Sequence, residues 1–478
     1  MKKPKLTLLP LLLATTGGAS LAMSPTNEAS LQRSIESKSP NVIYILADDL
    51  GYGDLGCYGQ RHFATPYIDA MAKSGMLFTQ NYAGSSVSAP SRCSILTGKD
   101  SGHGYIRGNQ AATKPPINED GRNYGHPLAQ GEVTLAEIFK QAGYQTACIG
   151  KWGLGGPNTT GSPNAQGFDY FYGYLSQGDA HKHYPTYLHE NDKFVELDGS
   201  QYSHDIFEQK AMDYITECRE KPFFLYLAFT LVHAELLIDE QELSVERGRF
   251  EEPKPFVQGK SSYGSQESPR AAFAAMARRL DLSVGRINEL LARLGMEENT
   301  LVIFTSDNGP HMEGGADPEF FDSNGIYRGI KRDLYEGGIR VPMIATWQGE
   351  IAEGSTCDDP VAFWDILPTM AELIGVETPA ECDGVSLLPA FGGQSAPRQR
   401  HLYWELNQQG GKQAIRVGDW KLLRLNTKLA EQSYYELYNI ANDPEESNNL
   451  IETEREMAAK LKQAMGEART ESELYTIF

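Results

Sequence analysis

Short apolar runs alternate with amphipathic stretches along most of the chain. Five runs have the length and composition of strands, at residues 41–49, 145–150, 221–230, 300–309 and 341–347. They are apolar almost throughout, which is typical of strands that are covered on both faces of a sheet.

Amphipathic helices are predicted between these strands. One spans residues 134–144, with Thr134 as its cap. Another ends at Gly295 and places apolar residues at spacings of three and four, at Leu280, Val284, Ile287, Leu291 and Leu294. The alternation predicts an α/β fold with a large, mainly parallel sheet sandwiched by helices.

After about residue 395 the pattern changes. Short strands separated by turns are predicted in "HLYWEL", "KQAIRVGDWKLLRL" and "YYELYNI", and "ETEREMAAKLKQAMGEAR" is predicted to be a closing helix. We therefore expect an α/β domain at 40–394 and a small antiparallel sheet with a helix at 395–478. The polar loop at 251–270 is expected to form the rim of a site or a mobile surface.

The first residues have the pattern of an export signal. Lys2, Lys3 and Lys5 precede the apolar stretch "LTLLPLLLATT", and the small-residue sequence "ASLA" follows. This predicts a signal peptide at 1–22 and a flexible leader at 23–39, and hence a secreted or periplasmic protein. The residue directly after the predicted cleavage site is not a cysteine and no later stretch could span a bilayer, so no membrane anchor is expected.

Charge and cysteine content narrow the function classes. The 478 residues carry a formal charge of -20, which argues against nucleic acid as a partner and requires a local cationic pocket for any anionic substrate. The six cysteines form no CxxC pair, so a thiolate metal site is not expected. In an exported protein one or two disulfides could form, and Cys357 with Cys382 is the first choice.

Two predicted strands end in oxygen-bearing side chains. Asp48 and Asp49 end the first strand, and Asp307 and Asn308 end the strand that begins near residue 300. Such residues often only cap strand ends. Because ligands of open parallel sheets bind beyond the carboxyl ends of the strands, the two pairs together predict a Ca²⁺ or Mg²⁺ site rather than a zinc site.

Ser88 stands at the start of "SAPSRCSILTG". Serine as a cap, proline in the first turn and Gly98 after the end are ordinary features of a helix. The same helix start could bind an anion, and Arg92 lies one turn further on. An unmodified serine hydroxyl is a weak nucleophile, so chemistry at Ser88 would need a base, a metal or a chemical conversion.

The stretch "SAPSRCSILTG" resembles the signature of type I sulfatases of the alkaline phosphatase superfamily. The blocks "ADDLGYGD", "GKWGLG", "TSDNG" and "YEGGIRVP" match other blocks of that family in the same order, over roughly residues 40 to 450. The resemblance implies an alkaline-phosphatase-like fold and a sulfuric ester hydrolase. It also implies that a maturase converts Ser88, which replaces the commoner cysteine, to Cα-formylglycine.

The resemblance further assigns roles to individual residues. It implies one Ca²⁺ per chain held by Asp48, Asp49, Asp307 and Asn308. Arg92 would hold the formylglycine hydrate, Lys151 and Lys331 would hold sulfate oxygens, and His233 would be a candidate general acid near the leaving oxygen.

One position departs from the family pattern. Many relatives have histidine where this chain has Gly153, and His181, His183 or His311 could fill the gap. The blocks are similar to those of bacterial carbohydrate sulfatases, which suggests galactose or N-acetylgalactosamine sulfate as substrate. The sugar is expected to contact the loops at 177–185 and 310–329, through His181, His183, His311, Asp322 and Arg328, although these residues could instead only order the loops.

Two alternatives stay open at this point. One is a phosphomonoester or phosphonate hydrolase of the same superfamily, although the Asp/His zinc set of a serine alkaline phosphatase has no match here. The other is a sulfated-glycan-binding protein in which Ser88 stays unmodified and no turnover occurs.

Overall fold

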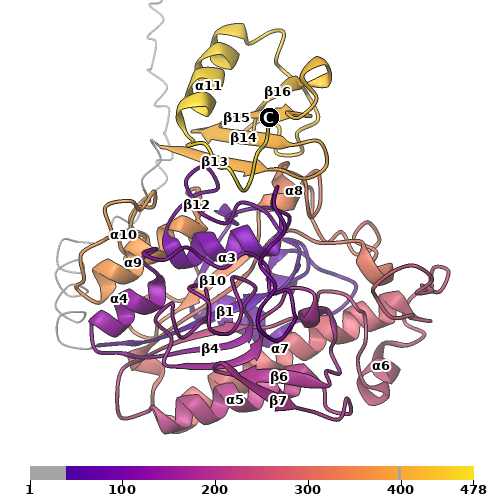
Figure 1. Ribbon diagram of the computed structural model, residues 1–478, viewed down its shortest axis with the longest axis vertical. Helices are drawn as coiled ribbons and strands as arrows, with labels where there is room; N and C mark the ends of the chain where they lie inside the picture. Colours follow the sequence, from indigo (N-terminus) through magenta and orange to yellow (C-terminus); the bar gives the residue numbers. More distant parts are fainter. Residues whose placement is uncertain (1–38, 397–399) are drawn as a thin grey trace, which may run out of the picture.

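The computed structural model describes residues 39–396 and 400–478. The predicted signal peptide and nearly all of the predicted leader lie outside the described residues. A large α/β body makes up most of the molecule, and a small sheet with one helix lies at one end of it (Figure 1).

The body is organised around a ten-stranded sheet. Its strand order is β11 (Ser355–Cys357), β2 (Met76–Phe78), β10 (Met343–Thr346), β9 (Thr300–Ser306), β1 (Asn41–Ala47), β8 (Phe223–Ala228), β4 (Gln145–Lys151), β5 (Tyr170–Tyr174), β6 (Tyr187–Glu190) and β7 (Lys193–Glu196). The central strands from β9 to β5 are parallel, whereas β10 at one side and the β6–β7 pair at the other run antiparallel to their neighbours. The predicted mainly parallel sheet is confirmed.

Helices cover both faces of this sheet (Figure 1). One face packs against α3 (Ser88–Thr97), α4 (Leu135–Gln141), α9 (Ile366–Leu373) and α10 (Leu388–Phe391). The other packs against α2 (Pro66–Ser74), α5 (Ser203–Glu217), α6 (Glu240–Glu246) and α7 (Pro269–Leu294). In β1, Tyr44 belongs to the first core and Ile43 to the second, because successive strand residues point to opposite faces.

Short elements complete the body. A two-stranded sheet pairs β3 (Asn81–Tyr82) with β12 (Val361–Ala362), and α8 (Glu336–Ile339) lies near the C-terminal sheet. Single 3₁₀ turns occur at Gly56–Tyr58, Asp179–His181, Glu297–Asn299, Glu313–Gly315, Phe363–Asp365 and Ala430–Gln432.

Both predicted helices form where expected. Thr134 accepts the backbone N–H of Glu137, and the Glu137 side chain accepts the N–H of Thr134, which is a complete capping box. Gly295 ends α7 with a φ of 66°, a conformation that favours glycine. This helix begins at Pro269, so it is longer than its apolar repeat alone indicates.

The C-terminal part is an antiparallel meander of four strands: β13 (His401–Leu406), β14 (Lys412–Val417), β15 (Trp420–Leu425) and β16 (Tyr434–Asn439). One face packs against α11 (Arg455–Glu467), and the other packs Trp404 against Tyr82 and Trp364 of the body. The expected small sheet with a closing helix is therefore confirmed, while the boundary at residue 395 stays a prediction.

The expected disulfide between Cys357 and Cys382 is not formed. Both residues are thiols in this structure. Cys382 Sγ lies 3.2 Å from the carbonyl oxygen of Gly98, whereas Cys357 ends the edge strand β11. No helix among the described residues is long and apolar enough to cross a membrane.

Candidate active site

The two predicted pairs of oxygen-bearing residues meet at one edge of the sheet. Strands β1 and β9 are neighbours with Ala47 opposite Ser306, so the residues that follow them lie side by side. The backbone N–H of Asp49 donates to Asp307 Oδ1 at 3.1 Å, and Asn308 Nδ2 donates to Asp49 Oδ1 at 2.7 Å. Asp48, Asp49, Asp307 and Asn308 are all fully buried.

Ser88 faces this group from the start of α3. It is the first helical residue and not the cap, which corrects the sequence-based expectation: the extended residue Val87 occupies the cap position and makes no side-chain cap bond. The side chain of Asn109 accepts the N–H of Ala89 at 3.0 Å instead. The Ser88 hydroxyl is thereby left to donate to Asp48 Oδ1 at 3.2 Å.

Arg92 and Lys151 add positive charge beside Ser88. Arg92 binds Asp307 Oδ2 through Nε at 3.1 Å and Nη2 at 2.8 Å, and its Nη1 donates to the carbonyl of Lys151. Lys151 Nζ lies 2.7 Å from Asp48 Oδ2 and 3.3 Å from Ser88 Oγ. Burial lowers the pKa of Lys151, and the opposite charge of Asp48 counteracts that effect.

Lys331 and His233 form a second basic pair. Lys331 Nζ donates to Asp49 Oδ2 at 2.7 Å and lies 2.9 Å from His233 Nε2. His233 Nδ1 lies 2.5 Å from the carbonyl oxygen of Ala234, which assigns the ring proton to Nδ1. Burial, and then the charge of Lys331, lower the pKa of His233 well below its ordinary value, so the ring is neutral and accepts from Lys331.

Three other predicted histidines gather around His233. His181 stacks on its ring at a centroid distance of 4.5 Å and His311 at 5.4 Å, while His183 Nε2 lies 3.0 Å from its carbonyl oxygen. Burial lowers the pKa of His181 to about 3. Burial would also lower the pKa of His311, but its contact with Glu313 raises it instead.

The structure does not bring Asp322 and Arg328 to this cluster. Arg328 donates to Tyr438 Oη and to the carbonyl of Glu446, and its guanidinium lies 3.9 Å from the ring centre of Tyr335. Asp322 is exposed in a turn and accepts the N–H of Gly325. These contacts direct Arg328 towards the C-terminal sheet, so they do not favour a sugar-binding role.

Sequence reasoning missed Glu313 and Tyr263. Glu313 Oε2 lies 3.2 Å from His311 Nδ1 and 3.4 Å from Lys331 Nζ. Tyr263 comes from the polar loop at 251–270 and lies 5.3 Å from His181 between ring centres, so this loop reaches the histidine cluster. Glu313 lies inside the loop at 310–329, but no spacing distinguishes it from the neighbouring acids.

The oxygen cluster suits a hard cation. Asn308 Oδ1 is buried and has no hydrogen-bond partner, although it lies among the carboxylates of Asp48, Asp49 and Asp307. An unmet buried acceptor costs about 1–3 kcal/mol unless a ligand satisfies it. Carboxylate and amide oxygens are the ligands that Ca²⁺ prefers, so the residues present fit this ion.

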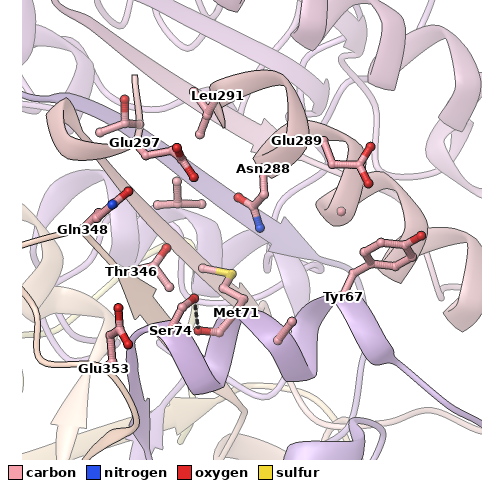
Figure 2. Close-up of a pocket in the computed structure, with 14 residues that line it drawn as sticks. Tyr67, Met71, Ser74, Asn288, Glu289, Leu291, Glu297, Thr346, Gln348 and Glu353 are labelled. Atoms are coloured by element: carbon pink, nitrogen blue, oxygen red, sulfur yellow. Dashed lines mark hydrogen bonds between the residues drawn. The ribbon is translucent and has the colours of Figure 1, made fainter. Parts of the chain in front are cut away.

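Two cavities flank different ends of the sheet. One, of about 580 Å³, is lined by Ala89 and Gly153, which follow Ser88 and Lys151 closely in the chain. The other, of about 460 Å³, lies between α2 and α7, where Tyr67, Met71 and Ser74 face Asn288 and Glu289 (Figure 2). The second cavity contains Thr300, at the amino end of β9, and is therefore at the end of the sheet opposite to Asp307.

Comparisons with known proteins identify the same family as the sequence motifs do. The family model of sulfatases matches residues 40–376, and the model of the C-terminal part of N-sulphoglucosamine sulphohydrolase matches residues 325–471. An N-acetylgalactosamine-6-O-sulfatase of Bacteroides thetaiotaomicron is 29% identical over 97% of this chain and 99% of its own length. The N-acetylgalactosamine-6-sulfatase of Mus musculus is 32% identical over 76% of this chain and 68% of its own length.

A solved structure agrees in fold. Ps i-CgsB in complex with k-i-k-neocarrahexaose is 27% identical, covers 91% of this chain and 95% of its own, and superposes with a TM-score of 0.76. Sheet, helices and the buried acidic site at the carboxyl ends of the strands thus define a hydrolase of the alkaline phosphatase superfamily. Within that superfamily, the chain belongs to the sulfatase family and is a sulfuric ester hydrolase.

Proposed function

We propose that this protein removes sulfate from N-acetylgalactosamine or galactose sulfates, with a formylglycine at position 88 and a calcium ion. The observation that carries the proposal is the surroundings of Ser88: its buried hydroxyl lies 3.2 Å from Asp48 Oδ1 and 3.3 Å from Lys151 Nζ. A carboxylate and an ammonium at one side chain suit a nucleophile that must be activated and whose substrate is an anion.

The proposed chemistry begins with oxidation of Ser88 by a maturase, which removes two hydrogens and leaves an aldehyde. Addition of water gives a carbon that bears two hydroxyls. One hydroxyl oxygen attacks the sulfur and the bond from sulfur to the sugar oxygen breaks. The second hydroxyl then loses its proton, the aldehyde re-forms, and sulfate leaves with the bond between carbon and its oxygen broken.

Cationic side chains have separate tasks in this scheme. Lys151 and Arg92 lie on the Ser88 side of the cluster and hold the hydrate and the sulfate oxygens. Lys331 and His233 share a hydrogen bond of 2.9 Å, and this pair supplies the proton that the sugar oxygen takes up. Burial would lower the pKa of Lys331, but the charges of Asp49 and Glu313 raise it. Lys331 therefore stays a cation that would hold a sulfate oxygen, and His233 stays the candidate proton donor.

Calcium would be held by Asp48, Asp49, Asp307 and Asn308. When bound, it supplies positive charge that stabilises the deprotonated hydroxyl and the developing sulfate. The unmet Asn308 Oδ1 supports this assignment, because it gives the ion an acceptor that no protein donor uses.

The substrate class rests on the relatives. The bacterial and mammalian proteins described above are named as N-acetylgalactosamine-6-sulfatases. The 6-sulfate of such a sugar is therefore the first substrate to test. We further propose export by the N-terminal signal, so that the maturase must modify Ser88 before or during export.

A two-part experiment tests the proposal. The protein is produced with a serine-accepting maturase, and the peptide that contains Ser88 is weighed by mass spectrometry. We expect a loss of two hydrogens, together with release of sulfate from N-acetylgalactosamine 6-sulfate at a higher kcat/KM than release of phosphate from the matching phosphate. Full activity with wholly unmodified Ser88, or a preference for the phosphate, would overturn the proposal.

A further inference from the structure

We propose that the 580 Å³ cavity beside Ser88 binds the sugar ring that carries the sulfate, and that the Gln177 amide donates a hydrogen bond to an oxygen of that ring. This inference rests on the proposed function and adds the residue that distinguishes a sugar from another alcohol. The sulfate-binding cations cannot make that distinction, because they contact only the group that all sulfate esters share.

The position of the cavity follows from two chain segments of the active site. Ala89, directly after Ser88, and Gly153, two residues after Lys151, both line it. A sulfate bound between Ser88 and Lys151 would therefore point its organic group towards this space. A volume of 580 Å³ is within the range of roughly 300–1000 Å³ that is common for small-molecule sites.

Gly153 makes room for Gln177. The β4–β5 pairing continues past the strand ends, with the N–H of Gly153 donating to the carbonyl of Leu175 at 3.1 Å. This pairing brings the Gln177 amide so close that a Cβ at position 153 would lie 1.9 Å from Gln177 Nε2. Gly153 also has a φ of 81°, a backbone angle that residues other than glycine rarely adopt. The absence of a side chain at position 153 is thus coupled to the place of the Gln177 amide.

Gln177 presents an unused donor. Its Nε2 is buried but has no hydrogen-bond partner in the described part of the chain. A buried donor in that state is destabilising, and a ligand oxygen can satisfy it. Sugars carry many such oxygens, and a site that is built to hydrogen-bond one rejects compounds that lack it.

The rest of the lining suits a sulfated sugar. Amide side chains come from Asn109, Gln110 and Asn123, and Lys114 adds an exposed cation. The residues that line the cavity include no carboxylate, although the chain as a whole carries a charge of -20. This local absence of negative charge reduces repulsion of an anionic glycan.

Asn109 connects the cavity to the reaction centre. Its Oδ1 accepts the N–H of Ala89 at 3.0 Å, and its side chain lines the same cavity. It is therefore a positioning residue for the first turn of α3, whereas Gln177 is the proposed contact to the sugar. The sequence predicts that the loop at 177–185 contacts the sugar, and the proposed contact comes from Gln177, the first residue of that loop.

The experiment uses the mature full-length enzyme with two substrates, N-acetylgalactosamine 6-sulfate and 4-nitrophenyl sulfate. Gln177→Leu removes the amide at similar volume, and Gln177→Glu replaces the donor by an acceptor of the same length. In both variants we expect the ratio of kcat/KM for the sugar sulfate to kcat/KM for the aryl sulfate to fall roughly 10- to 100-fold. Gln209→Ala, an exposed glutamine on α5, should leave the ratio unchanged.

The outcomes separate the inference from the proposed function. An unchanged ratio in either folded variant, including equal losses on both substrates, overturns the role of Gln177 while sulfatase activity stands. If the mature wild-type enzyme hydrolyses neither substrate, the proposed function fails and the inference fails with it. Thermal unfolding of each variant shows which of them are folded, and one folded variant is enough for the decision.

Discussion

The active site and the junction between the body and the C-terminal sheet both bury charged side chains, yet they use them differently. At the junction, Glu336 of α8 accepts from Lys421 Nζ at 2.9 Å, from Tyr82 Oη at 2.5 Å and from Arg340 Nη1 at 3.3 Å. Glu446 accepts the N–H of Glu336 and lies 3.0 Å from the same Lys421. Glu446 Oε1 meets Lys421 only as an ion pair and has no hydrogen-bond partner among the described residues, whereas both oxygens of Glu336 accept hydrogen bonds.

The active site differs in that the side chain of an unmet polar atom, Gln177 Nε2, lines a cavity. Asn308 Oδ1 and Gln177 Nε2 are buried without a partner, and a cavity opens beside Ser88. Burial of charge is common to both regions, so it does not identify a functional site by itself. Unmet polar atoms next to a cavity do, because they are costly until a ligand binds.

The sequence blocks that match the sulfatase family also differ in which of the two regions they supply. "SAPSRCSILTG" and "TSDNG" supply residues of the candidate active site, whereas "YEGGIRVP" supplies Glu336 and Arg340 to the junction. A motif that recurs with an enzyme family can therefore hold two parts of the fold together and take no part in chemistry.

The largest effect is expected at Ser88. Ser88→Ala should lower kcat by about 10⁴-fold or more, because it removes the nucleophile itself. Its hydroxyl makes only contacts of 3.2 and 3.3 Å to side chains, so the free energy of unfolding should change by less than about 1 kcal/mol. Sulfate release and urea unfolding measure the two quantities.

Ser94→Ala is the matched control, since Ser94 lies in the same helix and its hydroxyl has no hydrogen-bond partner among the described residues. It should keep both turnover and stability. Wild-type turnover in Ser88→Ala would contradict the assignment of the nucleophile.

At the junction we expect the opposite result, a large loss of stability with little change in kcat. Lys421→Met leaves the buried carboxylates of Glu336 and Glu446 without their shared cation, which should lower the free energy of unfolding by about 3–5 kcal/mol. The kcat of the folded fraction should stay at the wild-type value. Lys428→Met, at an exposed position of the same subdomain, should change neither quantity. A loss of turnover in folded Lys421→Met would show that the two clusters are coupled.

Calcium that binds at the proposed active site should raise both the free energy of unfolding and the rate of turnover. At a free concentration 100-fold above its dissociation constant, the ion should add about 2.7 kcal/mol to the free energy of unfolding. Chelation should remove this gain and the turnover, and added Ca²⁺ should restore them. Asp307→Asn should abolish the calcium-dependent shift in the melting temperature. A chelated protein with unchanged melting temperature and rate would refute the metal site.

The smallest expected effect is a pH dependence at the junction. Burial raises the pKa of Glu446 to about 7, against the attraction of Lys421, whereas Lys421 and Arg340 outweigh burial and lower the pKa of Glu336 to about 2. A raised carboxyl pKa means that folding favours the protonated form. The ionised Glu446 therefore costs stability progressively as the pH rises from about 4.5 to about 7.

Glu446→Gln removes this titration while keeping an acceptor for the Glu336 N–H. The stability of the variant relative to wild type should rise between pH 4.5 and 7 by an amount on the order of 1 kcal/mol. Urea unfolding across that range measures it. A difference that stays constant or falls would show that Glu446 is not the group that titrates.

The sequence was sufficient for the centre of the fold and insufficient for its edges. The strands β1, β4, β8, β9 and β10 are continuous apolar runs, and their burial on both faces follows from that composition. The two outermost strands at each side of the sheet, β11 and β2 and β6 and β7, have only three or four residues, and their pairing depends on tertiary contacts that no short window contains.

Some features of the candidate site could also be predicted from the sequence, whereas others could not. Proximity of Asp48 and Asp307 follows from parallel strands with acids at their ends. The cap at Ser88 was wrong because Asn109, 20 positions away, takes the N–H of Ala89. The contact of Gln177 with Gly153 requires the β4–β5 register, and the direction of Arg328 depends on the C-terminal sheet. None of these is a local property of the chain.

All ten residues of α3 are buried in the folded protein. An enzyme that oxidises Ser88 needs the side chain and its flanking backbone exposed, and opening such a core element costs a large part of the roughly 5–15 kcal/mol that stabilises a domain. Under the proposed function, oxidation of Ser88 must therefore precede folding. The active fraction of a preparation would then depend on the rates of oxidation and of folding, so a cell that makes the chain faster than it oxidises Ser88 should accumulate folded molecules that are inactive.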